Sequence, residues 1–170
     1  MEVMQGVPEL VAAARAQAKA SEDRISEILE FVNGQNASDA QLEELRVATV
    51  ALKLAAVDIF SLFEARMQHH FKRGPFSRKL KSLLLKSEKI DLADRVHQYY
   101  LAVNVLKHGK GASYRELLNA PNSLFCVKST GDIIANVEDA PADILDISVP
   151  GFFDGLTSTI LEAYHFLENK

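Results

Sequence analysis

The sequence predicts a mainly α protein, an up-and-down bundle of four to five long helices with a small β-hairpin-like insertion before the last helix. Apolar residues recur at spacings of three and four through most of the 170 residues. Asn-Gly and Gly-Pro pairs divide the chain into segments of helical length. Only residues 123–149 contain short strand-like runs. The absence of repeats and low-complexity linkers favours a single domain over residues 1–170.

The first helix is expected over residues 7–33. Pro8 suits its first turn, and Asn33-Gly34 is typical of a helix end. Its predicted apolar stripe consists of Leu10, Ile25, Ile28, Leu29 and Val32.

The second helix is expected to begin after a capping box formed by Ser38 and Gln41, and to extend to about His70. Gly74-Pro75 then breaks the chain. The residues expected on its buried side are Leu42, Leu45, Leu52, Ala55, Ala56, Ile59, Leu62 and Phe63.

A third helix is expected from Pro75 or Ser77 to Ser87, and a fourth from an Asp91 N-cap to Gly109. The third packs inward through Phe76, Leu80, Leu83 and Leu84. The apolar residues of the fourth follow the a/d spacing of a helix packed lengthwise on other helices. They are Leu92, Val96, Tyr99, Val103 and Leu106.

A short helical turn is expected over residues 114–118, followed by strands within 123–149 that include Cys126 as a buried apolar residue. Ser148 and Pro150 are expected to begin the last helix. Its predicted buried side consists of Phe152, Phe153, Leu156, Ile160, Tyr164 and Leu167.

A polar line runs along the fourth helix, formed by His97, Asn104 and His108. At about 100° per residue the three lie within a narrow arc, roughly 140° from the middle of the apolar seam. The line is therefore expected to face solvent, a partner chain or a ligand. Tyr100, Leu101 and Val105 flank it and offer apolar area for a homodimer through this helix.

Residues 104–109, Asn-Val-Leu-Lys-His-Gly, resemble the signature of HEPN domains. These are helical bundles that often act as metal-independent endoribonucleases, or are inactive relatives. Their pattern is an arginine, usually followed by a polar residue such as asparagine, then three variable residues and a histidine. Asn104 and His108 match, but Val103 stands where the arginine belongs.

The resemblance implies that His108 is a general acid or base, that Asn104 binds a phosphate oxygen or orients His108, and that two protomers pair their motif helices. Each residue also has a structural interpretation. His108 suits the negative end of a helix dipole, and Asn104 suits a helix surface or an interhelical hydrogen bond. Without the arginine, the cation that stabilises a phosphorane-like transition state must come from elsewhere. The candidates are Lys107, Lys110, Arg95 and Arg115.

The net charge of −4 is unevenly distributed. Residues 66–115 contain 12 lysines and arginines and three acids, whereas the remainder of the chain is strongly acidic. A local positive field favours binding of a polyanion such as RNA, although a solvated basic face has the same composition. The expected nucleic-acid-binding residues are Lys107, Lys110, Arg95, Arg115, Arg78 and Lys79.

Several other classes are disfavoured. The loop Gly109–Ser113 lacks the first glycine of a Walker motif and follows a helix instead of a strand, so neither a nucleotide triphosphatase nor a cofactor is expected. Its backbone amides and Lys110 could still hold a single phosphate. No metal is expected, because adjacent His69 and His70 cannot both face one ion on an α-helix. The single cysteine, the absence of a basic leader, and charges that interrupt the most apolar stretch favour a cytoplasmic protein without a membrane span.

Three functions remain open. The first is a degenerate HEPN-like homodimer that binds RNA or a partner without catalysis. The second is a metal-independent endoribonuclease using His108, Asn104 and a substitute cation. The third is a structural or regulatory dimer with no nucleic-acid role. Salt-dependent RNA binding separates the first two from the third, and cleavage that requires His108 selects the second.

Overall fold

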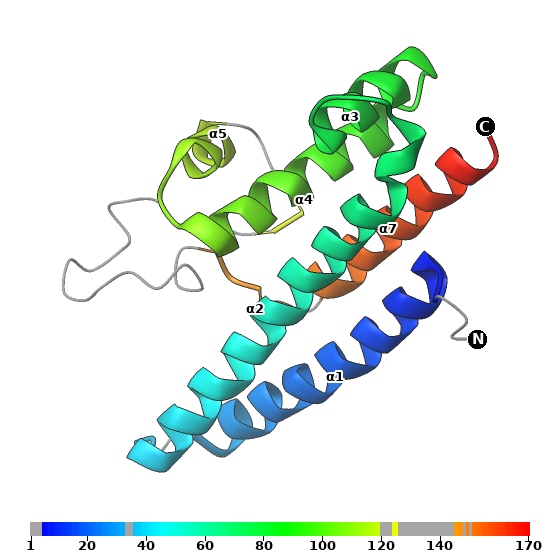
Figure 1. Ribbon diagram of the computed structural model, residues 1–170. Helices are drawn as coiled ribbons and strands as arrows, with labels where there is room; N and C mark the ends of the chain where they lie inside the picture. The colour runs from blue at the N-terminus through cyan, green and yellow to red at the C-terminus, as the bar shows by residue number, and fades with distance from the viewer. Residues whose placement is uncertain (1–4, 33–35, 120–123, 126–144, 148, 150) are drawn as a thin grey trace.

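The computed structural model describes residues 5–32, 36–119, 124–125, 145–147, 149 and 151–170. These residues are mainly helical, as the apolar spacing predicts, and they share one hydrophobic core. No helix in these ranges is long and apolar enough to cross a membrane. The elements are α1 (Val7–Val32), α2 (Asp39–Met67), the 3₁₀ helix η1 (Gln68–His70), α3 (Phe76–Lys86), α4 (Ile90–His108), α5 (Ala112–Asn119) and α7 (Phe152–Glu168) (Figure 1).

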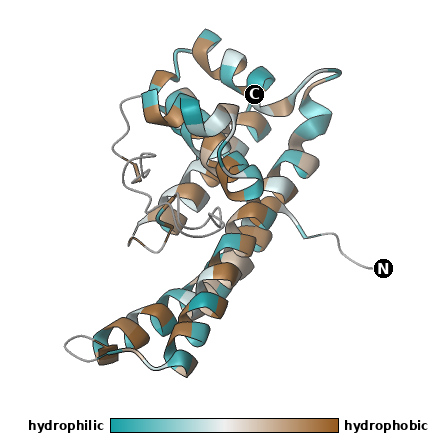
Figure 2. Ribbon diagram, turned by 90° about the vertical axis from the view of Figure 1, so that its left-hand side faces the viewer, coloured by the Kyte–Doolittle hydropathy of each residue, from teal (hydrophilic) through white to brown (hydrophobic). Residues whose placement is uncertain are grey.

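Helices α1 and α2 form a long antiparallel hairpin whose closed end extends beyond the other helices (Figures 1 and 2). The predicted capping box at the start of α2 is confirmed. Ser38 Oγ accepts a hydrogen bond from the Gln41 N–H at 3.2 Å, and Gln41 Oε1 accepts one from the Ser38 N–H at 2.9 Å. The box satisfies two backbone donors at the helix start.

Three leucines expected in the core are instead exposed: Leu29 at 51%, Leu42 at 53% and Leu62 at 39%. The prediction for these residues is wrong. Leu29 and Leu42 belong to the projecting part of the hairpin, where α1 and α2 have only each other to pack against (Figure 1). A helix with one neighbour buries one stripe, so its other apolar residues stay in contact with solvent.

The remaining helices pack around the second half of α2. Helices α4 and α7 both contact it, and α3 and α5 pack on α4. The ring of Phe63 on α2 meets Phe76 of α3 edge-on at 5.3 Å, and Tyr99 of α4 meets Phe152 of α7 at 5.8 Å. The predicted seam of α4 is confirmed, since each member is at most 7% exposed: Leu92, Val96, Tyr99, Val103 and Leu106.

The last helix begins at Phe152, and its predicted apolar side is buried except for the half-buried Tyr164. Most of the β insertion expected at residues 123–149, including Cys126, lies outside the described residues. Residues 124–125, 145–147 and 149 contain no strand, so the predicted hairpin is not seen there. Phe125, Leu145 and Ile147 are instead buried in the helical core.

The corner between α3 and α4 is a Schellman motif. The Lys89 N–H donates to Leu84 O at 2.9 Å and the Glu88 N–H to Leu85 O at 3.1 Å. Because this turn continues directly into α4, Lys89 is the N-cap and the predicted Asp91 N-cap is wrong. The Asp91 carboxylate instead accepts a hydrogen bond from Arg95 Nε at 2.8 Å.

Glu88 occupies the left-handed position of this motif with φ 62°, where glycine is the usual residue. We expect Glu88→Gly to raise the free energy of unfolding by about 1 kcal/mol, because the strain of a left-handed side chain is removed. Chemical denaturation measures this difference. Ser87→Gly, at the preceding position with φ −93°, is the control and is expected to give no gain. Equal stabilisation by both substitutions would contradict the assignment of strain to Glu88.

Candidate nucleic-acid interface

The polar line of α4 lies at a surface, but α5 folds back along it. His97 Nε2 lies 2.7 Å from the Glu116 Oε1 that accepts its hydrogen bond, and Asn104 Nδ2 donates to Ser113 Oγ at 3.3 Å. His108 is exposed at the end of α4. Two of the three predicted side chains therefore contact α5 of the same chain, and the third faces solvent.

Two adjoining pockets follow this line. One, of about 370 Å³, is enclosed by α3, α4 and α5 and includes His97 in its lining. The other, of about 360 Å³, is lined by Asn104 and His108. Both pockets share Tyr100, Ala112 and Ser113, so they form one continuous depression, here called the α4 groove.

The lining of the first pocket contains two cations and one carboxylate, that of Glu116, which is paired with His97. Arg78 and Lys81 reach it from α3. Helix α3 begins there at Phe76, after a Pro75 N-cap that provides no side-chain hydrogen bond, and α5 begins there at Ala112. The N–H groups of a first helical turn have no partner within their helix, and the helix dipole makes that end positive. Two helix N-termini and two cations thus outweigh the one carboxylate around this cavity, an arrangement that favours an anion.

Ser77 adds a buried hydroxyl to this pocket. The residue is 7% exposed, and no hydrogen-bond partner for its Oγ occurs within the described part of the chain. Leaving a buried hydroxyl unsatisfied costs about 1–3 kcal/mol, so such groups are rarely retained without a partner. A phosphate oxygen in the pocket would accept the hydrogen bond that Ser77 can donate.

The structure brings together only some of the predicted basic residues. Arg78 lines the α4 groove. Lys79, Lys107, Lys110 and Arg115 are exposed but do not line either pocket. Lys107 acts on α2, where it opposes the effect of burial that raises the pKa of Glu64.

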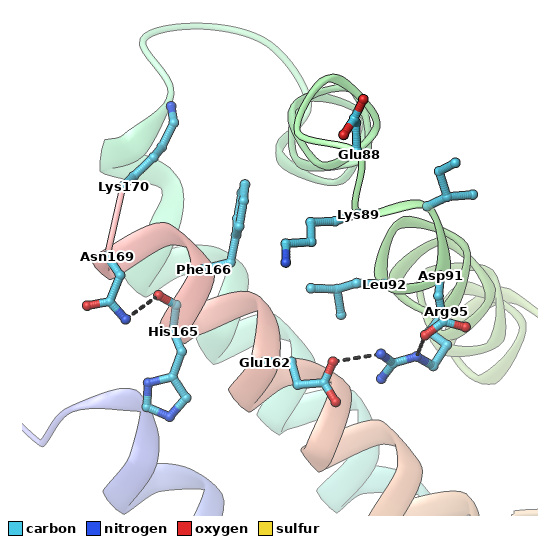
Figure 3. A pocket seen from close by; sticks show the side chains of 11 residues that line it. Glu88, Lys89, Asp91, Leu92, Arg95, Glu162, His165, Phe166, Asn169 and Lys170 are labelled. Carbon is cyan, nitrogen blue, oxygen red and sulfur yellow. Dashed lines mark hydrogen bonds and ion pairs between the residues drawn. The ribbon is translucent and has the colours of Figure 1, made fainter.

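Arg95 lies on the opposite side of α4. Nine residues separate it from Asn104, which is about two and a half helical turns. Its guanidinium donates to Glu162 Oε2 at 2.6 Å and to Asp91 Oδ2 at 2.8 Å, and the bond to Glu162 is the main cause that raises the pKa of Arg95. Figure 3 shows the three side chains in a separate pocket between α4 and α7. Arg95 therefore does not line the α4 groove, and it supplies no cation there in place of the arginine that the HEPN signature has at position 103.

Sequence reasoning missed Ser77 and Lys81. Lys81 follows Ser77 by four residues and Arg78 by three, so both side chains neighbour it on α3. That spacing next to Gly74-Pro75, which leaves a helix start uncapped, is the signal that could have found them. No comparable signal in the sequence predicts that α5 folds back on α4. That arrangement depends on the backbone turn at Gly109, where φ is 71°.

The sequence predicts a homodimer through accessible apolar side chains beside the polar line of α4. The prediction that Leu101 and Val105 are accessible is wrong. Leu101 and Val105 are 2% and 0% exposed, because α3 and α5 pack on α4 within the chain. Only the half-buried Tyr100 remains accessible. The exposed apolar side chains lie mainly on the projecting hairpin, among them Leu29, Phe31, Leu42, Val47, Val50 and Leu54.

His69 and His70 do not lie on an α-helix, as the expectation that they cannot both face one ion requires. Helix α2 ends at Met67, and both histidines belong to the 3₁₀ helix η1. One ring nitrogen of each histidine and a carboxylate oxygen of Glu168 lie within 4.8 Å of one another.

Comparison of the chain with protein-family models, with curated proteins and with solved structures finds no match.

Proposed function

We propose that this protein binds RNA through the α4 groove and does not cleave it. The observation that carries the proposal is the buried, unpartnered hydroxyl of Ser77 beside Arg78 and Lys81 at the meeting point of two helix N-termini. This pocket suits one backbone phosphate, which the hydroxyl, the two cations and first-turn N–H groups can bind together.

The continuation of the groove favours a nucleic acid over a free anion. Tyr100 is half-buried between the two pockets and stacks on His97 with an interplanar angle of 26°. Aromatic side chains beside a basic groove are the usual platform for bases of single-stranded RNA. Asn104 lies further along, where its amide can bind a base edge or a phosphate.

We propose that the protein does not cleave RNA because Val103 stands where the HEPN signature has its arginine. Its side chain is 1% exposed in the core, and Arg95 is held by two carboxylates on the other side of α4. A phosphorane-like transition state would thus lack the fixed cation that ribonuclease chemistry requires. The exposed His108 beside Asn104 is what keeps the endoribonuclease as the second candidate.

The test is fluorescence anisotropy with a labelled single-stranded RNA pool, without divalent metal, over a series of salt concentrations. We expect Arg78→Gln combined with Lys81→Gln to weaken binding at least about tenfold. The slope of log Kd against log salt concentration should fall by roughly one to two, because fewer counterions are released. Ser77→Ala should weaken binding several-fold without changing the salt dependence, because it removes a hydrogen bond and no charge.

The matched control is Lys19→Gln combined with Arg24→Gln, which removes the same charge from exposed positions of α1. It should leave the affinity within about twofold. Equal weakening by both pairs, or no binding by the wild type, would reject the α4 groove as an RNA site. Cleavage of the RNA by the wild type but not by His108→Ala would establish the endoribonuclease instead.

A further inference from the structure

A second polar cluster lies outside the lining of the α4 groove, where the segment after α2 meets the end of α7. His70 Nε2 donates to Glu168 Oε1 at 3.2 Å across 98 residues of sequence. The ring of His69 lies beside that of His70, with centroids 4.2 Å apart. The cluster consists of two imidazoles and one carboxylate, none of which takes part in the proposed RNA site.

We infer that His69, His70 and Glu168 bind one divalent transition-metal ion, with Zn²⁺ as the chemically best-matched ion. Two imidazole nitrogens and a carboxylate are a known catalytic or open-site ligand set for zinc, with water in the fourth position. The borderline-soft imidazoles disfavour Mg²⁺ and Ca²⁺, which prefer sites made wholly of oxygen ligands.

The distances fit a tetrahedral ion. Ligands about 2.0–2.1 Å from zinc in tetrahedral geometry are separated from one another by roughly 3.3 Å. The 3.2 Å between His70 Nε2 and Glu168 Oε1 already matches such an edge. The three ligand atoms lie within 4.8 Å of one another, so a rotation of the exposed His69 side chain would complete the set. A metal would replace the proton that His70 now shares with Glu168.

The local backbone supports both the orientation and the charge. His69 Nδ1 donates to the backbone carbonyl of Arg66 at 2.9 Å, which fixes the tautomer that leaves its Nε2 lone pair for a metal. Histidines in metal sites characteristically donate their other ring nitrogen in this way. Helix α7 ends here at Glu168, and the negative C-terminal end of a helix favours a cation.

The experiment uses the untagged full-length chain, first stripped of metal with a chelator and then titrated with Zn²⁺ by calorimetry. We expect one Zn²⁺ per chain in the wild type. Glu168→Gln and His70→Ala should each weaken that binding at least about tenfold. His165→Ala, an exposed histidine in the same last turn of α7 but outside the cluster, is the matched control and should bind as the wild type does.

The melting temperature with Zn²⁺ and the visible absorption of bound Co²⁺ are two further readouts of this site. Zn²⁺ should raise the melting temperature of the wild type and of His165→Ala but not that of Glu168→Gln, an isosteric change at a partly exposed residue. Co²⁺ should give the visible absorption of a tetrahedral site, lost in His70→Ala. Absence of binding by the wild type, or binding that the two cluster variants leave unchanged, would overturn the inference and make the cluster a surface ion pair.

Discussion

Gly155→Ala is expected to lower the free energy of unfolding by about 3 kcal/mol, although alanine is normally the better helix residue by about 1 kcal/mol. Gly155 lies inside α7 where this helix crosses Tyr99 of α4. A Cβ at position 155 would lie 2.1 Å from Tyr99 Oη and 3.3 Å from its Cζ. Tyr99 is 2% exposed, and it is held between the rings of Phe125 and Phe152 at 5.6 and 5.8 Å, so it has no space into which to retreat.

A double-mutant cycle tests this explanation by chemical denaturation. Tyr99→Phe removes the oxygen that the new methyl group would overlap, so in that background Gly155→Ala should cost at most about 1 kcal/mol. Gly111→Ala, where a Cβ would meet nothing within 4 Å, is the control and should be close to neutral. A cost at Gly155 that is unchanged by Tyr99→Phe would mean that the close approach of α7 to Tyr99 does not determine the effect.

The same crossing shows what the sequence can and cannot predict. The seam of α4 was predictable because its spacing depends only on helical geometry, and all its members are buried. Gly155 was not recognisable, since a glycine within a helical pattern does not reveal which side chain crosses it. Leu29 and Leu42 were assigned to the core for a related reason: periodicity gives the apolar side of a helix but not whether a second helix reaches it.

The candidate sites also differ in whether one helix or several packed elements determine them. Asn104 and His108 could be placed on one line because they belong to one helix. The pocket around Ser77 needs α3, α4 and α5 together, and the cluster at Glu168 joins segments 98 residues apart. The 3₁₀ turn at His69 and His70 changes the direction of two side chains, and residue spacing on an assumed α-helix gives the wrong geometry there.

Introducing at position 103 the arginine of the HEPN signature, which residues 104–109 resemble, is expected to unfold the protein. Val103→Arg would place a guanidinium on the core seam of α4, where Val103 is 1% exposed and its neighbours along the seam, Tyr99 and Leu106, are equally buried. An unpaired buried charge costs several kcal/mol, comparable with the whole stability of a small domain. We therefore expect loss of at least about 4 kcal/mol and no cooperative thermal transition near the wild-type temperature.

The control is Val47→Arg, which makes the same change on α2 at a position that is 55% exposed. It should alter stability by at most about 0.5 kcal/mol, since the charge stays in water. If Val103→Arg instead folds and cleaves RNA, α4 must be able to turn its seam toward the groove, and the proposal of a non-catalytic RNA-binding protein would fail. If it unfolds while Val47→Arg does not, position 103 serves the core in this chain, and a single substitution cannot place an arginine there.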